Sequence, residues 1–119
     1  MRVMVMVKGT AEYEAGQLPT LEQMAEMGAY NEQLIKAGIM LAGDGLLPSS
    51  RGCRVHFEGR RPTVVDGPFA EAKELVGGYW IWEVSSLEEA TEWLKRAPFD
   101  DAVVEIRRIG EPEDYADAQ

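Results

Sequence analysis

The chain has 119 residues, the length of one domain, and its 45% of hydrophobic residues can form a core without disulfides or metals. Its 21 acidic and 12 basic side chains give a net charge of −9, which disfavours nucleic acid because phosphate binding depends on clustered Lys and Arg. The single cysteine, Cys53, excludes an intramolecular disulfide and a cysteine-cluster metal site. No apolar run is long enough for a membrane span or a signal peptide, so we expect a cytoplasmic protein without a membrane partner.

The first half of the chain predicts a strand, a helix and a second strand. Residues 2–8 are rich in Val and Met, which favours a strand. After a polar loop, the Pro-Thr pair at 19–20 opens a helix that extends to about Lys36 and is ended by Gly38. Residues 39–42 are a short second strand.

A hairpin and a tight turn are predicted next. Residues 53–58 and 62–66 flank Glu58-Gly59-Arg60, a suitable hairpin turn. Asp66-Gly67-Pro68-Phe69 is a rigid corner, since Asp accepts backbone amides and the residue before proline avoids the helical region. A loop leads from it to a strong strand at residues 77–84.

The last elements are a helix, a strand and a tail. Ser86–Glu89 has the pattern of a capping box, and the helix that it begins ends before Pro98. Residues 103–109 are the final strand. We expect one domain over residues 1–110, followed by an acidic, flexible tail at 111–119.

This order of elements predicts a ferredoxin-like α+β fold of the βαββαβ type with an extra hairpin, its antiparallel sheet covered by two helices. Two helices cover one sheet face, yet the strands are apolar on both sides: Val3 and Val5 alternate with Met4. An uncovered apolar face is too large a patch for a monomer. We therefore predict a homodimer through the sheet face, with Trp80 and Trp82 in the dimer core.

Asn31 and Asp44 are candidates for a polar site. Asn31 falls inside the apolar stripe of the first helix, where a buried amide costs about 1–3 kcal/mol unless it finds a partner. Asp44, at the mouth of the neighbouring strand, is the expected partner, and the two would form the polar floor of a small cleft. The alternative is an internal hydrogen bond between helix and strand without a ligand.

The Asp66 corner admits a structural and a functional interpretation. In the first it is a rigid turn, and Phe69 anchors the loop in the core. In the second Asp66 edges a pocket together with Lys73 and Glu74. The sequence shows no phosphate loop, nucleophile elbow or metal-ligand cluster, so we expect no cofactor and no metal.

Residues Val65 to Glu74, with the sequence VDGPFAEAKE, and the Gly-Gly-Tyr-Trp run at 77–80 resemble the signature of the DGPF branch of the YCII-related protein family. The similarity extends over nearly the whole chain, through Asn31 with Ala37-Gly38, Gly43–Leu46, Ser86–Pro98 and Val104–Arg107. It implies a dimeric α/β barrel of ferredoxin-like subunits. Some relatives act on small chlorinated aromatics, and some such domains accompany sigma factors in larger chains.

In the wider family, a His on the first helix and an Asp after the second strand act as an acid–base pair. Asp44 matches the Asp by position, whereas the helix offers Tyr30 and Asn31 and the only histidine is His56 in the predicted hairpin. The resemblance thus implies Asp44 as the catalytic residue. The ligand-pocket candidates are Asn31, Tyr30, Asp66, Phe69 and Lys73.

Two functions remain open on these residues. The first is a cofactor-independent small-molecule enzyme, in which Asp44 is the acid or base and Asn31 orients or polarises the substrate. The second is a non-catalytic dimeric module that binds a metabolite or a transcription-related protein partner. A solvent-accessible cleft joining Asn31 and Asp44 would favour the first.

Overall fold

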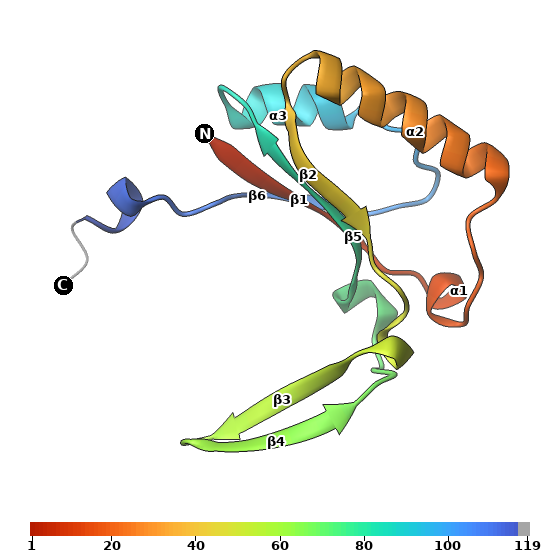
Figure 1. Ribbon diagram of the computed structural model, residues 1–119, viewed down its shortest axis with the longest axis vertical. Coiled ribbons are helices and arrows are strands. Elements are labelled where there is room, and N and C mark those ends of the chain that lie inside the picture. Colours follow the sequence, from red (N-terminus) through yellow and green to blue (C-terminus); the bar gives the residue numbers. More distant parts are fainter. Residues whose placement is uncertain (117–119) are drawn as a thin grey trace.

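A four-stranded antiparallel sheet with helices on one face forms the body of the molecule (Figure 1). The computed structural model describes residues 1–116. The strands lie in the order β2-β5-β1-β6, and all three neighbouring pairs are antiparallel. The body consists of β1 (Arg2–Lys8), α2 (Leu21–Lys36), β2 (Met40–Gly45), β5 (Val76–Glu83), α3 (Leu87–Leu94) and β6 (Val104–Arg108). This order confirms the predicted ferredoxin-like α+β fold.

The extra hairpin is also present and lies apart from the sheet. Strands β3 (Cys53–Glu58) and β4 (Arg61–Asp66) pair only with each other among the described strands, and Figure 1 shows them standing away from the body. The turn Gly59 adopts a φ of 62°, which a glycine accepts without strain. The short turns η1 (Ser49–Arg51) and η2 (Ala72–Glu74) connect the hairpin to β2 and β5.

Two segments differ from the sequence expectation. The predicted polar loop contains one helical turn, α1 (Ala11–Glu14), because the Thr10 side chain accepts a hydrogen bond from the Tyr13 N–H at 3.1 Å. The tail that we expected to be flexible contains a turn, η3 (Pro112–Tyr115), and an ion pair of 2.7 Å joins Arg2 to Glu111. Residues 117–119 lie outside the described part of the chain.

Local signals set the helix ends. Thr20 and Gln23 form a reciprocal capping box at the start of α2, and Gly38, with a φ of 73°, follows its end. At α3, Ser86 accepts from the Glu89 N–H at 3.0 Å, whereas the Glu89 carboxylate accepts from Ser85 and not from the capping residue. Among the described residues, no helix is long and apolar enough to cross a membrane.

The core lies between the helices and one face of the sheet. Strand register pairs Val3 with Trp82 and Val5 with Trp80, and all four side chains are buried on the helix side. The two indole centroids are 5.6 Å apart. The prediction that these tryptophans belong to a dimer core was wrong: they pack under the helices of their own chain, against residues such as Leu34.

The opposite face of the sheet, here called the open face, carries a mixture of apolar and charged side chains. Met4 and Met6 alternate with the buried valines and are only half-buried, and both pair with residues of β6. Glu105 lies 3.5 Å from Lys8 and 4.0 Å from Arg107 in two ion pairs. None of the described helices covers this face (Figure 1).

Tyr30 should make stability fall at high pH. Its hydroxyl donates to the Trp93 carbonyl at 2.6 Å, and burial raises the pKa of Tyr30 to about 12, from about 10 in an unfolded chain. The folded state therefore holds the phenol proton more tightly, and this contribution to the free energy of unfolding is complete below about pH 10 and is lost as pH rises towards 12.

We expect Tyr30→Phe to be less stable than the wild type near pH 7, by about 1 kcal/mol for the lost hydrogen bond. The difference in the free energy of unfolding between the two proteins should narrow above about pH 10, where only the wild type loses the contribution of the Tyr30 phenol. Urea unfolding at several pH values measures both effects. An unchanged gap across this pH range would show that Tyr30 does not titrate in this way.

Candidate functional site

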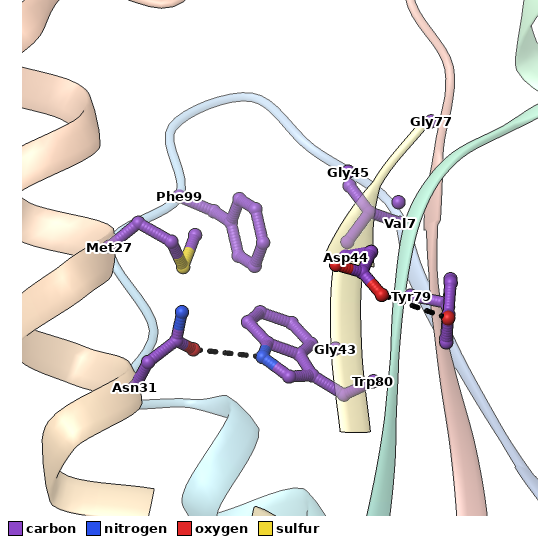
Figure 2. A pocket seen from close by; sticks show the side chains of 11 residues that line it. Val7, Met27, Asn31, Gly43, Asp44, Gly45, Gly77, Tyr79, Trp80 and Phe99 are labelled. Atoms are coloured by element: carbon purple, nitrogen blue, oxygen red, sulfur yellow. Dashed lines mark hydrogen bonds between the residues drawn. The ribbon is translucent and has the colours of Figure 1, made fainter. Parts of the chain in front are cut away.

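A cleft opens between α2 and the glycine-rich ends of β2 and β5. Its inner part is a cavity of about 380 Å³ (Figure 2). The residues that line it are Val7, Met27, Asn31, Gly43, Asp44, Gly45, Gly77, Gly78, Tyr79, Trp80 and Phe99. It continues into an outer groove between α1, the start of α2 and residues 98–102. Both parts share Val7, Met27, Gly45, Gly77 and Phe99.

Glycines make the room for this cavity. A Cβ on Gly43 would lie 2.5 Å from the Cδ1 atom of Trp80, so the indole packs directly over the bare backbone of β2. Gly45 pairs with Gly78, which leaves both strands without side chains where the cavity opens. The Gly43-Asp44-Gly45 and Gly77-Gly78 runs are the sequence signal for this space, although on sequence alone they indicate only the family resemblance.

Asn31 is fixed by the core tryptophan. The Trp80 indole N–H donates to the Asn31 Oδ1 atom at 2.9 Å. Because an indole nitrogen is only a donor, the amide oxygen must face it, and the Asn31 NH₂ group is turned into the cavity, as Figure 2 shows. The prediction that a buried Asn31 must find a polar partner is confirmed, but its partner is Trp80 and not Asp44.

Asp44 lies at the rim of the cavity and is exposed. Strand alternation explains its distance from Asn31: Gly43 pairs with the inward-facing Trp80, so Asp44 pairs with Tyr79, which faces the other way. The Tyr79 hydroxyl donates to the Asp44 Oδ2 atom at 3.1 Å, and this hydrogen bond raises the pKa of Tyr79. The cleft therefore holds both side chains without direct contact between them.

The other predicted pocket residues lie elsewhere. Tyr30 is in the core, edge-on to Trp80 with ring centroids 5.9 Å apart, because its position on α2 faces α3. Asp66, Phe69 and Lys73 belong to the hairpin end and the following loop, and none of them lines the inner cavity or the outer groove. Phe69 does not enter the core; the Arg54 guanidinium lies 3.9 Å from its ring centroid.

Phe99 and Met27 are site residues that the sequence analysis missed. Phe99 follows the Pro98 that ends the α3 segment, and its ring centroid is 6.1 Å from that of Trp80 at an angle of 73°. Figure 2 shows the Met27 thioether beside the cavity. Neither residue type signals a site without knowledge of the topology. Among the described residues, no histidine lines either part of the cleft.

The family model of the YCII-related domain matches residues 1–112. The chain belongs to the YCII-related domain family. This confirms the family resemblance seen in the sequence.

Two individual proteins are similar to this YCII-related chain. The uncharacterized protein R00369 of Rhizobium meliloti (strain 1021) is 28% identical over 72 residues, which are 60% of this chain and 58% of that protein. The similarity thus spans little more than half of that relative. The second is a solved structure, 5-chloro-2-hydroxyhydroquinone dehydrochlorinase (TftG) from Burkholderia phenoliruptrix AC1100 in complex with 2,5-dihydroxybenzoquinone.

That structure has a TM-score of 0.50 and 21% identity, covering 92% of this chain and 96% of its own. The similarity shows the fold, the ferredoxin-like arrangement of an antiparallel sheet with helices on one face.

Replacing Asn31 by Leu should lower the free energy of unfolding by about 1–3 kcal/mol, because the buried Trp80 N–H loses its acceptor. Replacing Trp80 by Phe in the same chain removes the orphaned donor. The double variant should therefore be less destabilised than the sum of Asn31→Leu and Trp80→Phe. Denaturant unfolding of the four proteins measures this coupling, and strict additivity would mean that the hydrogen bond contributes nothing.

Proposed function

We propose that the cleft is the active site of an enzyme that acts on a compact organic molecule by proton transfer coupled to elimination or hydrolysis, without a cofactor. The observation that carries the proposal is the pairing of a fixed donor, the Asn31 NH₂, with an exposed carboxylate, Asp44, on one cavity that opens to solvent. Ligand sites commonly combine apolar walls with a few such polar groups.

The side chains that line the cavity favour a ligand with a planar ring. The Trp80 indole, the Phe99 ring and the Met27 thioether surround the cavity, and aromatic and thioether groups pack well against a planar π-system. A volume of about 380 Å³ is near the lower end for ligand pockets, so a single-ring molecule is the expected size. The dehydrochlorinase of the same fold was solved with such a molecule, 2,5-dihydroxybenzoquinone.

The two polar groups have distinct roles in this mechanism. Asp44 accepts a proton from the substrate, the electron pair released forms the new π bond, and the leaving group departs with the electrons of the bond that breaks. The Asn31 N–H donates to the substrate oxygen on which negative charge develops. Tyr79 holds one carboxylate oxygen of Asp44, which leaves Oδ1 available to the substrate.

The test is binding and turnover of hydroxylated benzenes, their chlorinated forms and hydroxyquinones by the wild type, Asp44→Asn and Asn31→Leu. We expect Asp44→Asn to reduce turnover roughly 10²- to 10⁴-fold while it still binds the ligand, because it lacks the base but keeps its shape. Asn31→Leu should weaken binding as well as turnover. A matched control is Asp114→Asn in the C-terminal turn, outside the cleft.

Full turnover in Asp44→Asn would refute the catalytic role. If the wild type binds these ligands without turning any of them over, and Asp44→Asn binds them equally well, the non-catalytic binding module becomes the better proposal. The experiment that then identifies the ligand of the binding module is a thermal-shift screen of other small metabolites on the wild type and Asp44→Asn.

We also propose a homodimer through the open face of the sheet. The half-buried Met4, Met6 and Ile81 side chains on this face give an apolar patch that a second sheet would cover, and a twofold pair is the commonest arrangement. Sedimentation at micromolar concentration should give a dimer. Ile81→Lys should shift it to monomer, whereas Ile35→Lys, on the exposed side of α2, should not. A monomeric wild type would contradict the proposal.

A further inference from the structure

The β3–β4 hairpin has an apolar face that no described part of the chain covers. Its register pairs Val55 with Val64 and Phe57 with Pro62, and strand alternation places these four side chains on one face. Val55, Val64 and Phe57 are 46%, 62% and 69% exposed. The pairs between them, such as His56 with Thr63, place polar groups on the other face. The hairpin is therefore amphipathic, which is typical of an element that packs its apolar face against another protein surface.

The hairpin is held to its own body at the base. The Gly67 N–H donates to the Gly52 carbonyl at 3.0 Å, and the Phe69 N–H donates to the Ser49 Oγ atom at 3.0 Å. Ser49 in turn donates to the Glu14 carboxylate of α1 at 2.6 Å. These contacts fix the direction of the hairpin, and Figure 1 shows its tip pointing away from α1 and hence from the outer groove of its own chain. A two-stranded hairpin without a supporting surface is at best marginally stable in water.

The net charge of the hairpin indicates which protein surface it packs against. Residues 51–66 contain four arginines and two acidic residues, a net +2 in a chain of −9, which leaves −11 on the rest. The outer groove is the acidic and apolar counterpart. Four acidic side chains line it, Glu12, Glu26, Asp100 and Asp101, against one basic side chain, Lys8. Leu18 and Met24 of the same groove are 75% and 49% exposed.

We propose that the hairpin is an arm that docks, apolar face down, on the outer groove of a second copy of this chain. Phe57 and Val64 then cover the exposed Leu18 and Met24 of that copy, and Arg60 in the turn at the hairpin tip meets its acidic rim. Because the groove continues into the inner cavity, the arm of one copy closes the site of the other, and the site is complete only in the pair. This contact does not depend on what the cavity binds or on whether it is catalytic.

Cross-linking between differently substituted copies tests the arm directly. In a Cys53→Ser background, a chain with Arg60→Cys is mixed with a chain carrying Asp100→Cys, and a bifunctional thiol reagent joins cysteines that lie close together. We expect the cross-linked pair of the two chains to exceed either self-linked pair. Glu88→Cys at the start of α3, used in place of Asp100→Cys, is the matched control and should give no such product. Equal yields at the two positions would overturn the proposal.

The apolar face is tested by a second pair of variants. Phe57→Ser/Val64→Ser should lower the cross-linking yield roughly tenfold or more, as expected for the loss of central apolar contacts. His56→Ser/Thr63→Ser, on the polar face, should leave it unchanged. Both pairs change side chains that are exposed in the single chain, and circular dichroism confirms that each variant is folded. An apolar-face variant that is folded and still cross-links fully would also overturn the proposal.

The natural Cys53 gives an independent measurement that needs no introduced cysteine. It is exposed in the single chain and lies opposite Asp66 on the apolar face of the arm. Its alkylation rate should fall as protein concentration rises through the association range, and Phe57→Ser/Val64→Ser should abolish this fall. A dimer detected by sedimentation in which Cys53 reacts as fast as in the monomer would show that the copies associate without docking the arm.

Discussion

The hydrogen bond between the Trp80 indole and the Asn31 amide is the constraint on which the cleft depends. It joins the centre of α2 to the central strand β5 at the boundary between core and cavity. On one side of this bond the indole belongs to the packed layer with Trp82 and Tyr30. On the other side it forces the amide to present its NH₂ group to the cavity. The same indole thus stabilises the fold and determines the polarity that a ligand meets.

The period-two alternation of the strands decides which of the other side chains face the helices and which lie on the open face. Residues that face the helices form the dry core, and their neighbours along each strand form the open face with Met4, Met6 and the ion pairs of Glu105. Asp44 falls in the second set, while the cavity reaches it from the side because Gly43 and Gly45 have no side chains. The carboxylate can therefore remain exposed, and so solvated, while still bordering an apolar space.

The sequence predicted the fold well because its signals are local. The Thr20 cap, the glycine after α2 and the turn at Gly59 each set an element boundary through short-range chemistry. The need of Asn31 for a partner was also predictable, since burial in an apolar stripe is visible in a helical wheel. Its actual partner was not, because strand register decides whether Asp44 or Trp80 faces the helix.

The rest of the site could not be read from the sequence for a related reason. Tyr30 and Asn31 are neighbours on α2, and only the packing of α3 sends the first into the core and the second to the cavity. Phe99 reaches the cavity from a loop that carries no motif. The Asp66 corner, the strongest family signal, lies at the foot of the hairpin, outside the cavity and the groove.

The point at which the hairpin enters the chain has an evolutionary consequence. It is inserted between β2 and β5, which are themselves neighbours in the sheet, with Gly45 paired to Gly78. The body would need only a tight turn at this place, so the hairpin can lengthen, shorten or change its surface without altering the register of any sheet strand. Variation among homologues can therefore change what borders the cleft from outside while the core, with Trp80 and Asn31, stays the same.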